Sequence, residues 1–249
     1  MTCRVFLVGE GPTDIGDLVE LPGYRQGKEG FLQPILRRMI AGAVELKFFD
    51  GRKLSRMEKA LKKEPSRELQ TRKAAQALAL ASVLGADVLV FACDVDKARG
   101  TATPAERRRR LREIRTSIDA GFEYARKTDA DAKRVLTVSA VPSRMIEAWA
   151  LADREALAAL LEVPIASLDY RPPEELWGDE ENPASNHPKC VWRRVIGRSH
   201  SHAEIAERCR PRVLEHECPE SFVPFARDVD DAVKRCRRGP SAQATATIR

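Results

Sequence analysis

Acidic residues follow two short apolar runs of the sequence, and their types and spacing favour divalent-metal chemistry. Glu10 and Asp14 come after the first run, and Asp94 and Asp96 come after the second. Carboxylates that lie close together repel one another unless a cation neutralises them, and hard oxygen ligands of this kind suit Mg²⁺ or Mn²⁺. We therefore expect these four residues to form a metal site if the fold brings the two runs together.

Both runs have the composition of strands that are buried on both faces. Each holds about five β-branched or large apolar residues, is too short for a helix and is bounded by Gly or Asp. If the two strands lie parallel in one open sheet, the acids that follow them meet at its carboxyl edge, where such folds bind ligands. Asp14 can serve there as a ligand or can cap a following helix, and the sequence leaves both roles open.

Strand-like and helix-like segments alternate along the first 140 residues. Strands are expected over 4–8, 44–49, 87–93 and 135–140, and helices over 31–40 and 66–84, with a further helix start at 55–58 and a loop over 21–30. The clearest helix start is Thr103, followed by Pro at the first helical position and Glu at the third. The alternation predicts an α/β fold with a Rossmann-like, mainly parallel four-stranded sheet flanked by helices.

Beyond residue 143 the sequence predicts helices and no further strand. The helical stretches are 143–161, 202–215 and 222–237, and a long irregular connection is expected over 164–189. We therefore expect a metal-binding domain over 1–150, a helical C-terminal lobe over 151–239 and a frayed tail over 240–249.

The net charge of +6 is unevenly distributed along the chain. Residues 52–73 contain nine bases and three acids, and residues 97–115 contain eight bases and two acids. Basic residues beside an acidic metal site suit a phosphodiester substrate, because Lys and Arg hold the backbone while metal ions act on the scissile group. A solvated helix face is the alternative. The residues expected to contact nucleic acid are Lys97, Arg99, Arg107, Arg108, Arg109 and Arg110.

The two acidic motifs resemble the signature of the Toprim domain, which primases, topoisomerases, recombination proteins and OLD-type nucleases share. In that signature a Glu follows the first strand, here Glu10, and an Asp-x-Asp follows the third, here Asp94 and Asp96. Residues 10–14 are similar to the nuclease version, Glu-Gly-x-x-Glu, with Asp14 in the second acidic place. This resemblance covers about the first 150 residues.

Three motifs of the C-terminal half are similar to stand-alone bacterial Toprim proteins related to the OLD nucleases, a group suspected of phage defence. They are Ile-Glu-Ala-Trp-Ala-Leu-Ala-Asp at 146–153, His-Pro-Lys at 187–189 and Cys-Pro-Glu-Ser-Phe at 218–222. The resemblance makes Glu147 a further acid of the site, although an exposed helix Glu is the simpler alternative.

The resemblance implies a metal-dependent phosphodiester hydrolase, a nuclease acting on DNA or RNA in phage defence or DNA repair. Its catalytic residues would be Glu10, Asp94, Asp96 and Glu147, and with Asp14 these would bind Mg²⁺ or Mn²⁺. One alternative is a non-catalytic Toprim module that binds nucleic acid or a partner protein. Another is a haloacid-dehalogenase-like phosphatase. In such phosphatases the Asp-x-Asp follows the first strand and the fifth place of the motif is Thr or Val, whereas here the strand is the third and Ala98 fills that place.

Several motifs that would indicate other functions or another location are not found in the sequence. No Gly-x-x-x-x-Gly-Lys-Ser/Thr motif occurs, so any ATPase activity would come from a partner protein. No apolar stretch approaches the ~20 residues that span a bilayer, and no secretory leader is recognisable, so we expect a cytoplasmic protein with no membrane contact. The six cysteines are expected to be thiols. The His/Cys-rich segment 187–218 lacks the Cys-x₂₋₄-Cys pair that is typical of a zinc site.

Overall fold

The structure is a computed structural model, and it describes residues 2–16, 29–40, 42–53, 66–95 and 103–238. Its centre is an all-parallel four-stranded sheet in the order β2-β1-β3-β4. The strands are β1 (Thr2–Gly9), β2 (Glu45–Lys53), β3 (Val88–Ala92) and β4 (Leu136–Ala140). All four predicted strands are confirmed. β2 runs four residues past its expected end, and its register with β1 shifts between Val5 and Phe6.

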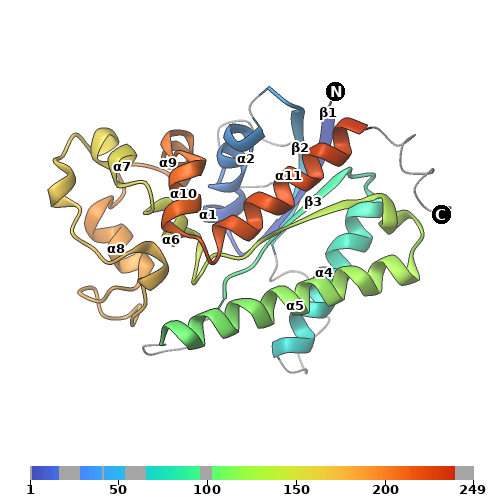
Figure 1. The fold of residues 1–249 in the computed structure, drawn as a ribbon, viewed down its shortest axis with the longest axis horizontal. Helices are drawn as coiled ribbons and strands as arrows, with labels where there is room; N and C mark the ends of the chain where they lie inside the picture. Colours follow the sequence, from blue (N-terminus) through green and yellow to red (C-terminus); the bar gives the residue numbers. More distant parts are fainter. Residues whose placement is uncertain (1, 17–28, 41, 54–65, 96–102, 239–249) are drawn as a thin grey trace.

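Helices cover both faces of the sheet (Figure 1). On one face lie α2 (Leu32–Ile40) and α11 (Phe222–Arg238), and on the other lie α4 (Ser66–Val83) and α5 (Pro104–Thr128). The strand sequences explain this arrangement, because successive side chains point to opposite faces. Val5 and Leu7 of β1 join the core under α2 and α11, whereas Phe6 and Val8 join the core under α4 and α5.

Local signals in the sequence fix the ends of the two crossover helices. Thr103 Oγ1 accepts a hydrogen bond of 3.2 Å from Glu106 N at the start of α5, as predicted. α4 ends at Val83, and Gly85 in the turn that follows has a positive φ of 65°, which suits a residue without a Cβ atom. The helix start expected at 55–58 and most of the loop expected at 21–30 lie outside the described residues.

The smaller helices lie mainly beyond the carboxyl edge of the sheet, at the left of Figure 1. They are α1 (Pro12–Ile15), α6 (Ile146–Ala150), α7 (Arg154–Leu161), α8 (Pro188–Val195), α9 (His202–Arg208) and α10 (Pro211–Glu217). Short 3₁₀ turns are η2 (Asp131–Arg134), η3 (Ile165–Ser167) and η4 (Pro173–Glu175). The described chain beyond β4 contains no further strand, and 164–187 is largely irregular, both as expected.

Two of the predicted C-terminal helices are each divided in two. The stretch 143–161 breaks before Asp153, which instead caps α7 by accepting a 3.1 Å hydrogen bond from Ala156 N. The stretch 202–215 breaks at Pro211, which has no N–H to continue α9. Arg210 lies at this second break and makes a two-pronged ion pair with Asp153. This ion pair connects the two places at which the predicted helices are interrupted.

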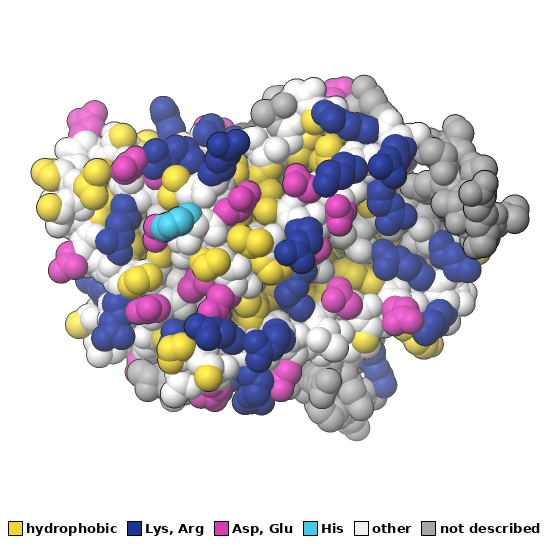
Figure 2. Space-filling model, viewed as in Figure 1, with side chains coloured by type: hydrophobic (Ala, Val, Ile, Leu, Met, Phe, Trp, Pro, Cys, Tyr) yellow, Lys and Arg dark blue, Asp and Glu magenta, His cyan; other side chains and the backbone are white. Residues whose placement is uncertain are grey.

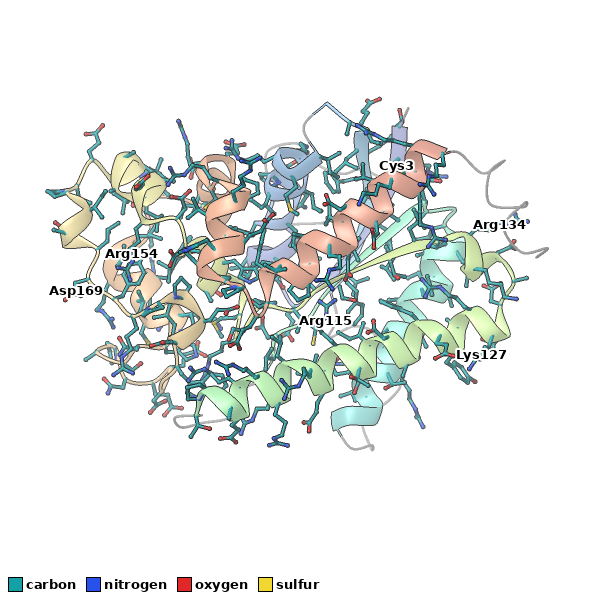
Figure 3. All side chains as sticks on the ribbon, in the orientation of Figure 1. Cys3, Arg115, Lys127, Arg134, Arg154 and Asp169 are labelled. Atoms are coloured by element: carbon teal, nitrogen blue, oxygen red, sulfur yellow. A yellow bond between two sulfur atoms is a disulfide. The ribbon has the colours of Figure 1, made fainter. Side chains whose placement is uncertain are left out.

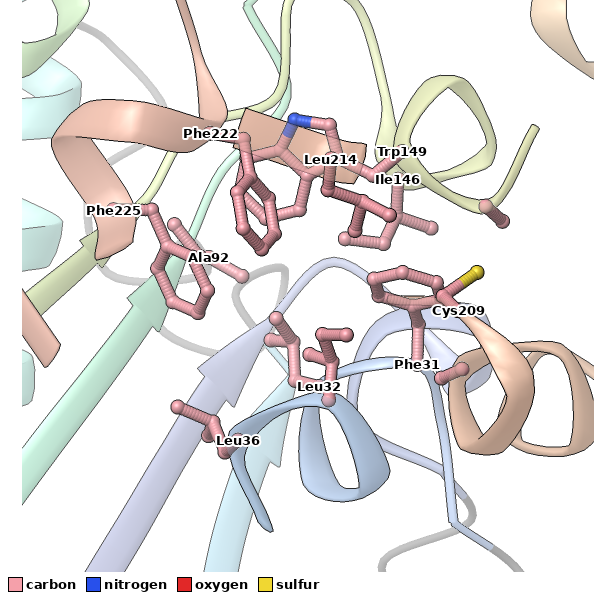
Figure 4. Close-up of a cluster of buried hydrophobic side chains, with 14 of the residues drawn as sticks. Phe31, Leu32, Leu36, Ala92, Ile146, Trp149, Cys209, Leu214, Phe222 and Phe225 are labelled. Carbon is pink, nitrogen blue, oxygen red and sulfur yellow. The ribbon is translucent and has the colours of Figure 1, made fainter. Parts of the chain in front are cut away.

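The last helix, α11, returns from the C-terminal part of the chain to the sheet. Trp149 of α6 packs against Phe222 and Phe225 of α11, with ring centroids 5.0 and 5.1 Å apart, and α2 completes the same cluster (Figure 4). The core therefore runs without interruption from the sheet into the helices of 151–238. The division of the chain at residue 150 stays a prediction.

The prediction that all six cysteines are thiols is wrong for two of them. Cys3 at the start of β1 and Cys236 near the end of α11 form a disulfide, and Cys3 is labelled beside that end of α11 in Figure 3. The pair is 233 residues apart, so cysteine spacing gave no sign of it. The other four cysteines are buried thiols.

Side chains protect the free edge of β4. Asp228 of α11 accepts hydrogen bonds from Ser139 N at 3.2 Å and from Arg115 of α5 at 3.0 Å. Arg115 also donates to the carbonyl oxygen of Ser139 at 3.1 Å (Figure 3). The N–H and C=O of Ser139 on the edge strand are therefore satisfied by side chains from both covering helices. Within the described residues, no helix is long and apolar enough to cross a membrane.

Candidate active site at the carboxyl edge of the sheet

A cavity of about 540 Å³ opens at the carboxyl ends of β1 and β3. Four of the five predicted acidic residues line it: Glu10, Asp14, Asp94 and Glu147. They come from the loop after β1, from α1, from the loop after β3 and from α6, so four separate segments contribute one carboxylate each. The fifth acid, Asp96, and the predicted nucleic-acid contacts Lys97 and Arg99 lie outside the described residues.

Asp14 shapes the loop that carries Glu10. Its Oδ2 accepts hydrogen bonds from the backbone nitrogens of Glu10, at 2.7 Å, and Gly11, at 3.3 Å. It is the third residue of α1 and reaches back toward the helix start, so the alternative that it occupies the N-cap position is wrong, because that position belongs to Gly11. A Cβ atom on Gly9 would lie 2.7 Å from Ile15, which explains the glycine at the end of β1.

Glu10 links the two acidic loops across the sheet. Because β1 and β3 are neighbours, the loops that follow them lie side by side. Glu10 Oε1 accepts a hydrogen bond of 3.3 Å from Asp94 N. The backbone of Val95 is tied in turn to the segment after β4, donating at 3.3 Å to the carbonyl oxygen of Arg144. Three strand ends are thus connected around the cavity.

Burial and mutual repulsion hinder ionisation of two of these acids. Burial, and then the charges of Asp14, Glu10 and Glu147, raise the pKa of Asp94 well above its usual range. Burial, and then the charges of Glu147 and Glu10, raise the pKa of Asp14 to about 6. The protein therefore holds a group of carboxylates that would be stabilised by a nearby cation.

Glu147 is kept ionised by a basic partner on α9. Burial opposes its ionisation, since the residue is only 4% exposed, but the interactions with His202, with the backbone at Glu147 and with Lys189 together hold the pKa of Glu147 below its usual range. His202 Nε2 lies 3.7 Å from Glu147 Oε1, and the His202 ring stacks on Trp192 at a centroid distance of 3.8 Å. Stacking on Trp192 thereby fixes a basic side chain behind Glu147.

The cavity is also lined by residues whose place in the site the sequence did not indicate. They are Arg144, His187, Lys189 and the loop around Glu180. Lys189 Nζ lies 3.3 Å from Glu180 Oε1, and Lys189 N donates to His187 Nδ1 at 3.3 Å. The His-Pro-Lys motif at 187–189 was the available signal, but its position in the cavity depends on how 164–187 folds back.

The donor atoms of the cavity suit a hard divalent cation, because they are carboxylate oxygens that burial and repulsion destabilise. Within the described residues, no three His, Cys, Asp or Glu side chains already stand at ligand spacing. Glu10 and Asp14 are turned toward backbone amides, so a cation would require them to rotate. The His/Cys-rich stretch 187–218, which is described throughout, likewise forms no such group.

The arginine run predicted to hold nucleic acid lies on the first turns of α5, and basic side chains are exposed at that end of the helix in Figure 2. Three of its members have internal carboxylate partners: Arg108 with Glu220, Arg109 with Glu113 at 3.0 Å, and Arg110 with Glu106 at 2.6 Å. Arg108 and Arg109 are nonetheless more than half exposed. Their positive charge is thus partly compensated and still open to solvent.

No protein-family model, curated protein or solved structure matches the chain. The arrangement of the residues around the cavity therefore carries the functional proposal.

Proposed function

We propose that the protein is a Toprim-like phosphodiester hydrolase that depends on Mg²⁺ or Mn²⁺ and acts on DNA or RNA. The observation that carries this proposal is the meeting of Glu10, Asp14, Asp94 and Glu147 in one cavity at the carboxyl edge of a parallel sheet. Glu10 follows β1 and Asp94 follows β3, which are the places that the Toprim signature gives to its Glu and its first Asp.

In this proposal the four carboxylates, with Asp96, would hold one or two cations. When bound, Mg²⁺ or Mn²⁺ would lower the pKa of a water molecule and offset negative charge on the leaving oxygen. Glu10 is only partly buried, so it can exchange protons with solvent and serve as the general base or acid. Asp14 keeps the Glu10 loop in place, and His202 keeps Glu147 charged. Any ATP-dependent step would require a partner protein.

The test is cleavage of supercoiled, linear and single-stranded DNA and of RNA by the pure protein, in Mg²⁺, in Mn²⁺ and in EDTA. We expect cleavage in one of the two metals and none in EDTA. Asp94→Asn and Glu10→Gln should each reduce the rate by at least about 100-fold, because each removes a charge from the reacting centre. Asp231→Asn, on the exposed surface of α11, is the matched control and should cleave like the wild type.

The other outcomes separate the alternatives. Binding of nucleic acid without cleavage in any metal would favour the non-catalytic module. Release of phosphate from small monoesters, with no polynucleotide cleaved, would favour the phosphatase. Cleavage that persists in Asp94→Asn would contradict the assignment of the site.

A further inference from the structure

Arg144 is a buried cation in a cavity that otherwise collects carboxylates. Only 4% of the residue is exposed, yet it lines the cavity together with Glu10, Asp94 and Glu147. Arginine is seldom buried so completely without a specific role. Its carbonyl oxygen accepts a hydrogen bond from Val95 N, so the backbone of Arg144 is fixed beside the loop that carries Asp94.

Trp177 supports the guanidinium of Arg144. The guanidinium carbon lies 4.3 Å from the centroid of the Trp177 ring, which is the distance of a close cation–π contact. The same ring has Arg110 of α5 at 5.8 Å. The indole therefore joins the exposed arginine run of α5 to the arginine inside the cavity.

The segment that carries Trp177 is anchored to the body of the protein. The Glu174 carboxylate accepts hydrogen bonds from Glu220 N at 3.1 Å and from Ser221 N at 2.8 Å. Trp177 itself is only 7% exposed. The segment that carries the ring is thus tied, through Glu174, to the residues just before α11.

Two positive side chains, Arg144 and Lys189, line the cavity together with the acidic loop of Asp179, Glu180 and Glu181. Lys189 is paired with Glu180 at 3.3 Å, and its charge also favours ionisation of Asp94 and Glu147. Burial, and then the charge of Arg144, lower the pKa of His187 to about 4, so this histidine is neutral at pH 7 and adds no charge. Arg144 is therefore the cavity cation that stands beside the candidate metal ligands and is stacked on an aromatic ring.

We propose that Arg144 binds the phosphate group of the substrate and that Trp177 is the residue that positions its guanidinium. This inference rests on the proposed function and names the residue that holds the scissile phosphate. Nε and Nη1 of Arg144 are buried, so Nη2 is the nitrogen that would donate a charge-assisted hydrogen bond to a phosphate oxygen. Stacking on Trp177 uses the face of the group, so the two contacts are compatible. Because Arg110 contacts the same Trp177 ring, a polynucleotide whose phosphate is bound at Arg144 would lie close to the start of α5.

The test measures binding of inorganic phosphate to the full-length protein in Mg²⁺ by titration calorimetry, beside kcat and KM on any polynucleotide that is cleaved. Removal of a charge-assisted hydrogen bond should weaken phosphate binding by about 10- to 100-fold in Arg144→Gln. Arg144→Lys keeps the charge without the planar guanidinium that stacks on Trp177 and should bind with intermediate affinity. Mg²⁺ affinity should not fall in either variant. Arg144→Gln removes a positive charge near the metal, Arg144→Lys retains one, and both leave every metal ligand in place.

Arg154 provides the matched control. Its guanidinium also lies over an aromatic ring, 4.5 Å from the centroid of Tyr170, but it does not line the cavity. Arg154→Gln should therefore bind phosphate like the wild type. If Arg144→Gln does not fold, Arg144→Lys decides: wild-type affinity in that variant overturns the proposal, and a loss of about tenfold or more supports it.

Trp177 is tested by replacement and rescue. Trp177→Ala should raise KM and weaken phosphate binding in the same direction as Arg144→Gln, whereas Trp177→Phe, which keeps an aromatic face, should restore most of both. If Trp177 has only a structural role, both variants should have a lower melting temperature and the same phosphate affinity as each other. That result overturns the positioning role of Trp177.

The outcomes also separate this inference from the proposed function. Phosphate binding that depends on Arg144 in a protein that cleaves no nucleic acid supports the inference and contradicts the nuclease. Nuclease activity that is unchanged in Arg144→Gln overturns the inference and leaves the nuclease in place. Absence of phosphate binding to the wild type also overturns it.

Discussion

Asp14 Oδ2 accepts a hydrogen bond of 2.7 Å from the backbone nitrogen of Glu10, so one acid of the site holds the loop that carries another. The contact requires only an acceptor atom, and it is made in a buried position where charge is costly. Asp14 therefore combines a structural role, which a neutral side chain could fill, with a charge that serves the site only when a cation is bound.

The first prediction is a pH-dependent stability difference between the wild type and Asp14→Asn. The folded-state pKa of Asp14 is about 6, above the ordinary value of 3.8, so its contribution to stability is complete below pH ~4 and is lost as the pH rises through 6. This loss amounts to at most about 3 kcal/mol at neutral pH. Asn is neutral at every pH, and its amide oxygen can still accept from Glu10 N.

In EDTA, Asp14→Asn should therefore melt above the wild type at pH 7 to 8, and the difference should disappear near pH 4. Thermal melts across that range measure the effect. Asp231→Asn, an exposed substitution, should follow the wild-type profile throughout. Parallel profiles for Asp14→Asn and the wild type would contradict the raised pKa.

The second prediction concerns cation binding at Asp94. A ligand that binds only the folded state raises its melting temperature, so Mn²⁺ should stabilise the wild type. Asp94→Ala should melt at or slightly above the wild type in EDTA, because removing one carboxylate relieves repulsion, and should gain little from Mn²⁺. We expect the same of Asp96→Ala from the sequence. An equal Mn²⁺-induced rise in the wild type and Asp94→Ala would refute the metal assignment.

The sequence predicted the sheet and its acids well because both depend on local signals. Each strand is a short apolar run, Glu10 and Asp94 come just after two of them, and Thr103 caps α5 through residues next to it. Glu147 lies further from its strand and was expected only from the family resemblance. Arg144 and His187 were not predicted as parts of the site. The place of His187, and the contact of Trp177 with Arg144, depend on the path of the 164–187 connection, and irregular chain has no periodicity from which that path could be inferred. Arg144 follows β4 within a few residues, but an arginine at that place gives no sign by itself that it lines the cavity.

Long-range pairs were missed for the same reason. The breaks at Asp153 and Pro211 each follow from the local sequence, but their connection through Arg210 joins segments 57 residues apart. The Cys3–Cys236 disulfide joins the two ends of the described chain, and spacing alone does not reveal such a pair.

The third prediction is a thiol count. Protein prepared without reductant and then denatured should show four reactive thiols, from Cys93, Cys190, Cys209 and Cys218, and six after reduction. Cys236→Ser should show five under both conditions. Six thiols in the unreduced wild type would mean that all the cysteines are free in solution, as the sequence alone suggests.

The fourth prediction concerns the edge of β4. Asp228→Ala should lower the free energy of unfolding by about 1–3 kcal/mol, because Ser139 N and the Arg115 guanidinium both lose an acceptor. Asp228→Asn keeps an acceptor for Ser139 N and should cost less. An exposed strand edge also promotes intermolecular pairing, so Asp228→Ala should aggregate sooner on heating, as light scattering would show. Equal stability of the two variants would contradict the protective role of Asp228.

The last prediction tests whether the start of α5 holds nucleic acid. Replacing Arg107, Arg108, Arg109 and Arg110 by Gln should preserve the helix, since Gln is nearly as good a helix former as Arg. The ion pairs of Arg108 and Arg110 with Glu220 and Glu106 are partly exposed, so their removal should change stability little. Affinity for nucleic acid should fall. On duplex DNA the slope of log K against log salt should become shallower by about 0.9 for each phosphate that the variant no longer neutralises.

The matched control removes charge from the other end of the same helix and the turn after it. Lys127, Lys133 and Arg134 are exposed and lie far from the start of α5, as the labels of Lys127 and Arg134 in Figure 3 show. Their replacement by Gln changes the net charge of the protein by a comparable amount without touching the cavity end. If both variants lose affinity alike, the attraction is only a general effect of net charge. If neither does, the nucleic-acid path lies elsewhere, with the basic segment 52–73 as the next candidate, and the metal site is unaffected.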